Sequence, residues 1–216
     1  MESSVSDTIY APPRAPIDIL HRDDDLLIVA KPEGLLSVPG KGEALADCLE
    51  TRLRADDPQV LLVHRLDRDT SGVMVFARNR AAQRHLGLQF ERRHLSKGYV
   101  ALVEGYVEEE KGTIDLPLKA DWPNRPRQMV HPEGRHAITH WRAIERGNGA
   151  TRMALHPETG RAHQLRVHMC SLGHPILGDP LYDGPDAPRM MLHSETLELR
   201  HPTGGERHTF RAPPPF

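Results

Sequence analysis

Apolar residues recur along the chain in short runs that alternate with polar turns, a pattern typical of β-strands. Continuous runs at 60–63 and 73–77 predict buried strands, because aliphatic and β-branched residues bounded by turn residues suit a sheet interior. Alternating apolar positions over 97–107 predict a strand with one buried face. Further short strands are predicted at 17–20, 26–30, 113–118, 137–144, 151–155, 190–200 and 208–211.

Three segments carry helical signals. Leucines at every fourth position predict a helix over 44–54. Asn79 is a suitable N-cap for a second helix that runs through about Arg93. A third helix is predicted over 161–172, with Gly173 just past its end. Helices and strands together predict an α+β fold in which a mixed, mostly antiparallel sheet is flanked by helices and loops.

The pattern indicates a single large unit. Residues 1–16 are polar and rich in proline, and we expect a flexible N-terminal arm there; residues 17–216 are expected to form one domain, since no linker or repeat divides them. No apolar run approaches the ~20 residues of a membrane span, and the N-terminus lacks the order of a signal peptide. Two cysteines favour free thiols in a reducing compartment. We expect a cytoplasmic monomer, because nothing indicates an obligate interface.

Charge is unevenly distributed. The net charge of −2 does not indicate a nucleic-acid-binding protein, yet residues 1–60 carry 12 acids and 6 Lys or Arg, which leaves the remainder at +4. Residues 78–97 include six basic residues and one acidic residue. Such a stretch either binds phosphates or forms a solvated helix face, and both interpretations stay open. The candidate phosphate contacts are Arg84, Arg92, Arg93 and Lys97.

The segment His64-Arg65-Leu66-Asp67 lies between the two buried runs and continues into a short polar turn. A loop held between rigid strands can place one carboxylate accurately for chemistry, so Asp67 is a candidate catalytic residue. The alternative is a surface turn in which Asp67 caps a backbone group or pairs with Arg65.

A second polar cluster opens the predicted helix at 161–172. Arg161, His163, Gln164 and Arg166 supply hydrogen-bond donors, and no acid occurs after Glu158 within this predicted helix. Such a helix start suits an anion or an internal carboxylate. Asp67 is the natural counter-charge, because an arginine beside a buried carboxylate keeps it ionised. In the alternative, these arginines are merely exposed.

These motifs carry a resemblance to a known family. HRLDRDTSGVMVFAR, TGRAHQLRVHMCSLGHPILGD, the upstream KPEGLLSVPG and the strand KGYVA occur in the order found in the RluA-type RNA pseudouridine synthases. The resemblance spans roughly residues 17–212. It implies the pseudouridine synthase fold, an RNA substrate and an isomerisation that needs no cofactor and no metal. It also implies a catalytic domain without the S4 RNA-binding domain of many relatives.

The resemblance implies roles residue by residue. Asp67 is similar to the catalytic aspartate, which attacks either the sugar or the uracil ring, and Arg166 to its arginine partner. Tyr99 and Leu165 match the pair that encloses the flipped uracil, with Tyr99 also placed to help proton removal from carbon 5. Arg65 matches the residue that enters the RNA where the base has left. The remaining candidate RNA contacts are His64, Arg161, Gln164, Trp122 and Arg125.

The segment Asp121–Gln128 is similar to family members that modify both a tRNA anticodon stem-loop and a hairpin of 23S ribosomal RNA. We therefore expect these two RNAs as partners, with the alternative that the enzyme acts on only one of these RNA classes. Trp122 and Arg125 are expected to stack on or grip the RNA loop, with the alternative that Trp122 is a core residue.

Three other interpretations have weaker support in the sequence. The fourteen histidines lack the spacing of known metal sites, and we expect no metal. A glycoside hydrolase generally needs two carboxylates, whereas the second cluster supplies arginines. A non-catalytic RNA-binding module would have no use for Asp67, Tyr99 and Arg166 together.

Overall fold

A single large sheet runs through the protein. The structure, a computed structural model, describes residues 10–216. The strands are β1 (Asp18–Arg22), β2 (Leu26–Lys31), β3 (Leu61–Leu62), β4 (Ser71–Ala77), β5 (Ser96–Glu104), β6 (Lys111–Asp115), β7 (Leu118–Ala120), β8 (Gln128–Val130), β9 (Ile138–Gly147), β10 (Ala150–Pro157), β11 (Leu192–Arg200) and β12 (Arg207–Arg211). The helices are η1 (Glu43–Leu45), α1 (Leu49–Asp56), α2 (Arg80–Glu91), η2 (Trp122–Asn124) and α3 (Gln164–Ser171).

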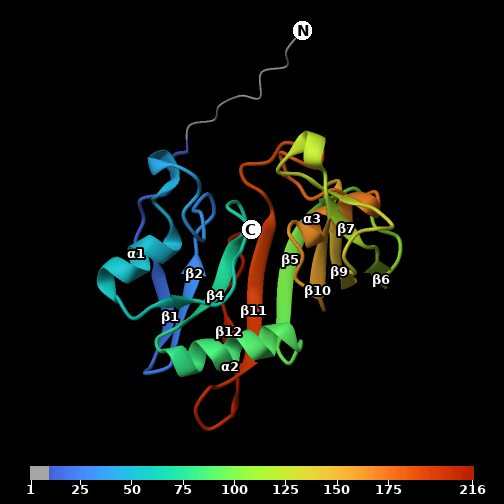
Figure 1. The fold of residues 1–216 in the computed structure, drawn as a ribbon. Helices are drawn as coiled ribbons and strands as arrows, with labels where there is room; N and C mark the ends of the chain where they lie inside the picture. The colour runs from blue at the N-terminus through green and yellow to red at the C-terminus, as the bar shows by residue number, and fades with distance from the viewer. Residues whose placement is uncertain (1–9) are drawn as a thin grey trace.

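The ten-stranded sheet has the order β1-β2-β4-β11-β5-β10-β9-β6, with β12 paired to β11 and β3 to β4. Only the β4–β11 pair is parallel, which confirms the mixed, mostly antiparallel α+β fold. Strands β7 and β8 form a separate two-stranded hairpin. Figure 1 shows β11 in the middle of the view, with β4 on one side and β5 on the other.

The central strand pair depends on one glycine. Gly72 has a φ of +114°, and a Cβ at this position would lie 2.1 Å from the carbonyl oxygen of Ser194 on β11. Because such an approach excludes any side chain, only glycine allows β4 and β11 to pair here. This contact joins the sheet half whose strands β3 and β4 flank the Asp67 loop to the half against which α3 packs.

Helix α2 matches its prediction, and the Asn79 side chain accepts a hydrogen bond from the Ala82 amide at 2.9 Å. The other two helices were predicted to begin too early. Helix α1 begins at Leu49, because Cys48 adopts an extended conformation and caps it. Helix α3 begins at Gln164, because His163 has left-handed backbone angles that a helix cannot contain.

The run at 60–63 is a shorter strand than predicted. Only Leu61 and Leu62 pair, with the end of β4, and both are half-buried. The pairing stops because the His64 ring takes over the next position: its Nε2 accepts the Val75 amide at 3.1 Å. The chain then leaves the sheet and forms the loop that carries Asp67.

Part of the predicted arm lies against the domain. Residues 1–9 fall outside the described residues. The Tyr10 hydroxyl donates to the Asp47 carbonyl at 2.9 Å and accepts from the Leu36 amide at 3.0 Å. Arg52 donates to the carbonyl of Pro13 at 2.7 Å. Residues 10–13 are therefore tied to α1 and to the chain that precedes it.

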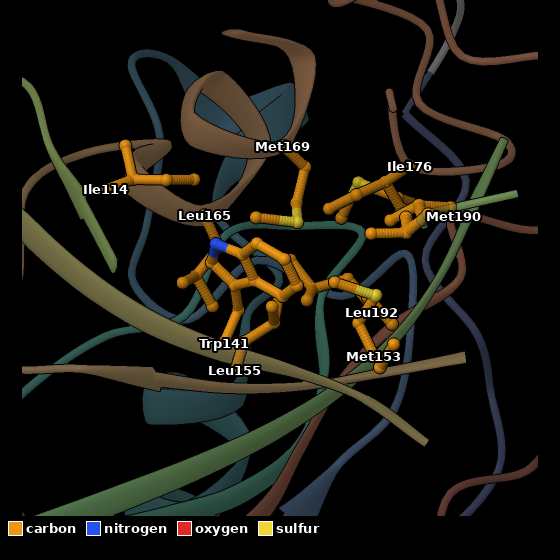
Figure 2. Close-up of a cluster of buried hydrophobic side chains, with 13 residues drawn as sticks. Ile114, Trp141, Met153, Leu155, Leu165, Met169, Ile176, Met190 and Leu192 are labelled. Atoms are coloured by element: carbon orange, nitrogen blue, oxygen red, sulfur yellow. The ribbon is translucent and has the colours of Figure 1, made fainter. Parts of the chain in front are cut away.

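One face of the sheet is covered by α3, and this is where the site lies. Figure 2 shows Leu165 and Met169 of α3 packed with Trp141 and Met153 in a buried cluster. Burial of these large side chains stabilises the contact by roughly 1.5–3 kcal/mol each. The cluster fixes α3 against β5, β9 and β10, and so fixes the direction in which its polar residues project.

Candidate active site

A cavity of about 310 Å³ opens between the 64–70 loop, β5 and the start of α3. It brings together residues more than ninety positions apart, as the two predicted motifs require. Nine of the sequence-predicted site residues line it, namely His64, Arg65, Asp67, Lys97, Tyr99, Arg161, Gln164, Leu165 and Arg166. Asp67 is the only acidic side chain in this lining. The predicted residues Arg84, Arg92, Arg93, Trp122 and Arg125 lie outside it.

Asp67 contacts the arginine that the sequence predicted for it. Arg166 Nη1 donates to Asp67 Oδ2 at 3.3 Å. The Arg166 side chain is 4% exposed and that of Asp67 is 29% exposed. The Asp67 carboxylate is therefore accessible from the cavity, while the cation that contacts it is buried. The alternative in which this arginine is merely exposed is therefore wrong.

Asp179 is the stronger partner of Arg166, and sequence reasoning did not single it out. Arg166 Nε and Nη2 donate to its two carboxylate oxygens at 2.6 and 2.7 Å, a bidentate arrangement with a fully buried acid. Burial disfavours the guanidinium charge, but Asp179 and then Asp67 outweigh it and raise the pKa of Arg166. One fixed cation thus lies between two carboxylates.

The KPEGLLSVPG motif clamps the Asp67 loop. Lys31 is 1% exposed, and its Nζ donates to the carbonyls of Pro32, Leu35 and Arg68 at 2.7–2.8 Å. Burial lowers the pKa of Lys31 to about 7, while the three carbonyl acceptors engage every proton of its ammonium form.

The Ser37 hydroxyl completes the clamp. It donates to the carbonyl of Leu66 at 2.7 Å and accepts from the Leu66 amide at 3.1 Å. The residues on both sides of Asp67 are therefore held by buried side chains from one upstream motif. This is the rigid support that accurate placement of a carboxylate requires.

Tyr99 and Leu165 line the cavity from β5 and α3, which places an aromatic ring and an aliphatic side chain at its wall. Burial raises the pKa of the Tyr99 hydroxyl to about 12, and the charge of Asp67 acts in the same direction. Tyr99 is thus a neutral phenol at physiological pH. Leu165 is also part of the core cluster, so its position is fixed by packing.

His64 and Gln164 use their polar atoms inside the protein. Burial lowers the pKa of His64 to about 3, and its neutral ring stacks on Phe90 with centroids 4.6 Å apart. The Gln164 amide accepts from Thr159 and Arg161 and donates to β9. Both residues shape the cavity wall, and neither offers a charge to an RNA phosphate.

Positive charge gathers at the cavity mouth. Arg65 is exposed, and Lys97 donates to the Thr159 carbonyl at 3.0 Å. Burial lowers the pKa of Arg161, with further lowering by the charges of Arg135 and Arg93. The cations around the mouth are therefore close enough to influence one another, an arrangement suited to polyanionic RNA.

The other basic candidates lie on the surface. Arg84 and Arg92 are exposed on and after α2, and Arg93 lies 3.9 Å from Glu158. At the tip of the β7–β8 hairpin, Trp122 is 63% exposed, with the Arg125 guanidinium 3.7 Å above its ring. The alternative that Trp122 is a core residue is wrong.

If the exposed arginines contact phosphates, RNA affinity should depend measurably on salt. We expect Arg92→Gln combined with Arg93→Gln to make the slope of log affinity against log salt concentration shallower by about one to two. Each lost phosphate contact reduces the magnitude of that slope by roughly 0.7–0.9. Burial lowers the pKa of Lys97 to about 8, so its charge is lost as pH rises through that value. The wild-type slope should therefore also flatten between pH 7 and pH 9. Fluorescence anisotropy with a labelled stem-loop measures both.

The control substitutes Lys111 and Arg142, exposed neighbours across β6 and β9 at the far edge of the sheet. Their replacement by glutamine should leave the slope unchanged. An unchanged slope in the Arg92 and Arg93 variant would assign that stretch to the solvated helix face.

Among residues 10–216, no group of three or more His, Cys, Asp or Glu side chains is arranged to hold a metal ion. Over the same part of the chain, no helix is long and apolar enough to cross a membrane.

Comparisons with known proteins point in the same direction as the site. Among curated proteins, the dual-specificity RNA pseudouridine synthase RluA of Escherichia coli (strain K12) is 49% identical over 214 residues, which cover 96% of this chain and 98% of that protein. RluA of Pasteurella multocida (strain Pm70) is 46% identical with the same coverage.

Solved structures agree in fold. Human RNA pseudouridylate synthase domain containing 1 superposes with a TM-score of 0.79 at 30% identity, over 95% of this chain and 87% of the human one. Human RNA pseudouridylate synthase domain containing 4 has a TM-score of 0.74 at 24% identity, over 92% and 88%, which shows the common fold alone. The model of the RNA pseudouridylate synthase family matches residues 25–171. The chain belongs to the RNA pseudouridylate synthase family, whose members are isomerases.

Proposed function

We propose that this protein isomerises uridine to pseudouridine in two structured RNAs, a tRNA anticodon stem-loop and a hairpin of 23S ribosomal RNA. The observation that carries the chemistry is the single carboxylate, Asp67, in a cavity otherwise lined by cations, polar groups and apolar side chains. The choice of two RNAs is supported by the dual-specificity name of relatives that are 46–49% identical over nearly the whole chain.

The cavity suits a reaction on one flipped nucleoside. Asp67 attacks the bound nucleoside and the N-glycosidic bond breaks. The uracil then turns and rejoins the ribose through carbon 5, and the bond to Asp67 breaks, which returns the free carboxylate. Carbon 5 loses its proton and nitrogen 1, released from the ribose, gains one, so the product is an isomer of the substrate. Tyr99 and Leu165 enclose the ring during this rotation. The neutral Tyr99 phenol acts first as a stacking and hydrogen-bonding group, since its pKa of about 12 leaves little phenolate. A glycoside hydrolase would need a second carboxylate in the same cavity.

The base must leave its stack before Asp67 can reach the nucleoside. Unstacking costs a few kcal/mol, which contacts elsewhere have to offset. Arg65 is exposed at the mouth of the cavity and is suited to enter the RNA where the base has left. The exposed Trp122 and Arg125 supply an aromatic and a cationic surface for splayed loop bases.

The test uses tritium release from uridine labelled at carbon 5. We expect turnover on an isolated, deproteinised anticodon stem-loop and on a short ribosomal hairpin, and none on a scrambled hairpin of equal length. Mapping of pseudouridine in cells that lack the protein should show loss at both RNA classes. Loss at only one class would contradict the dual-substrate proposal, whereas tritium release from neither RNA would contradict both proposed substrates.

A further inference from the structure

We propose that Tyr182 and His163 are positioning residues that fix the Asp67 carboxylate and couple its placement to the β7–β8 hairpin. The inference rests on the proposed function, because it assigns a catalytic effect to Asp67 and an RNA contact to the hairpin tip. It adds a specific path, made of two hydrogen bonds and one longer polar contact, between the surface where RNA would dock and the reacting carboxylate.

The path consists of three consecutive contacts. The backbone amide of Gln128, at the start of β8, donates to the Tyr182 hydroxyl at 2.8 Å. That hydroxyl lies 2.7 Å from His163 Nδ1, and His163 Nε2 lies 3.9 Å from Asp67 Oδ2. Gln128 is only three residues from Arg125, so the hairpin tip and the carboxylate are joined through two side chains.

The proton positions along this path follow from the partners. The Tyr182 hydroxyl already accepts from the Gln128 amide, so its own proton is directed to His163 Nδ1. Burial lowers the pKa of His163, which keeps the ring neutral, although the charge of Asp67 acts against this. The one ring proton is then on Nε2, the nitrogen that faces Asp67. The Tyr182 hydroxyl thus selects the tautomer that can donate to the carboxylate.

The 3.9 Å separation is too long for a hydrogen bond, but a shift of about 1 Å would form one. Catalytic hydrogen bonds are often long without substrate and tighten in the complex. His163 has a φ of +52°, an unusual left-handed conformation for a residue with a side chain. The chain therefore accepts backbone strain at the residue whose ring faces Asp67.

Tyr182 lies between the β7–β8 hairpin and the ion pairs that Arg166 forms with Asp67 and Asp179. Its side chain is 3% exposed and packs with Leu118 of β7 in a small buried cluster. The Arg127 and Arg166 guanidinium groups lie 5.3 and 5.1 Å from its ring centroid. A movement of the hairpin thus reaches Tyr182 through packing, through Arg127 and through the Gln128 amide, while Arg166 connects the same ring to Asp67.

The first test is Tyr182→Phe, which removes only the hydroxyl. We expect kcat on the stem-loop to fall by about tenfold or more, with KM changed by less than about threefold. Because His163 loses the donor that favours its neutral form, the acid limb of the kcat profile should also move to higher pH. The matched control is Tyr106→Phe at an exposed tyrosine, which should change neither quantity. Unchanged kcat and an unchanged pH profile in the Tyr182 variant would overturn the proposal.

A second pair of variants separates positioning from packing. His163→Gln keeps an amide donor near the position of Nε2, whereas His163→Leu keeps none. We expect the glutamine variant to retain several-fold more kcat than the leucine variant. Equal losses in two variants with wild-type melting curves would overturn the assignment to His163.

The coupling itself is tested by combining substitutions. Trp122→Ala should lower kcat in the wild type and should lower it less in the Tyr182→Phe background, while its effect on KM is the same in both. Strictly additive effects on kcat would overturn the coupling. NMR with ¹⁵N-labelled histidine reads the His163 tautomer without any turnover: an Nδ1-protonated ring would overturn the path even if the RNA substrates proposed above were correct.

Discussion

Asp67→Asn should abolish pseudouridine formation while RNA affinity stays within about tenfold, roughly 1.4 kcal/mol. The substitution keeps the size and polarity of the side chain and removes its charge and its nucleophilic oxygen. Arg166 can still donate to the amide oxygen, and Lys31 and Ser37 still hold the loop. The loss should therefore be confined to chemistry, and single-turnover assays with an anisotropy measurement of binding separate the two.

Asp69 offers a matched control on the same loop. Its carboxylate pairs with Arg68 and does not line the cavity. Asp69→Asn should keep turnover within a few-fold of the wild type. Residual turnover above about one per cent in the Asp67 variant would remove that residue from the nucleophile's role.

Arg166→Met is expected to have two large effects at once. Turnover should fall strongly, because Asp67 loses the guanidinium group that donates to its carboxylate. The unfolding free energy should fall by about 3–5 kcal/mol, because Asp179 is left as a fully buried acid without its bidentate partner. Urea denaturation and a single-turnover assay measure the two effects separately.

A double variant distinguishes the effect of Arg166 on turnover from its effect on stability. Arg166→Met with Asp179→Asn removes both charges and keeps an oxygen that accepts from the Leu181 amide. Much of the lost stability should return, since no unpaired charge stays buried, but turnover should not. Recovery of turnover together with stability would show that Arg166 serves the fold and not Asp67.

Much of the fold could be predicted because local patterns decide it. The continuous apolar run that became β4 is buried at every position, and Asn79 caps α2 as its side chain predicts. The start of α3 was misplaced because helical spacing cannot reveal the left-handed turn at His163. That turn is set by tertiary contacts with Tyr182, which lies nineteen residues further along the chain.

Only part of the candidate site could be predicted, because local patterns reveal some of its contacts and packing between distant residues decides the others. The Asp67–Arg166 contact follows from charge and from motif order. No local pattern singles out Asp179, because an acid before a proline is typical of a turn. Only the packed structure shows that it is buried against Arg166. The neutral state of His64 likewise depends on Phe90 and Val75, which the sequence does not place beside it.

The position of β11 has a consequence for synthesis on the ribosome. Asp67 and Arg166 belong to sheet halves that meet only through this strand, and its pairing with β4 spans more than a hundred residues. Residues 192–200 leave the exit tunnel after both halves have emerged. A nascent chain that has exposed every residue of the cavity except Leu192 therefore still lacks the strand that brings Asp67 and Arg166 together. Newly made protein should thus become active on RNA only after residues 192–200 have left the ribosome.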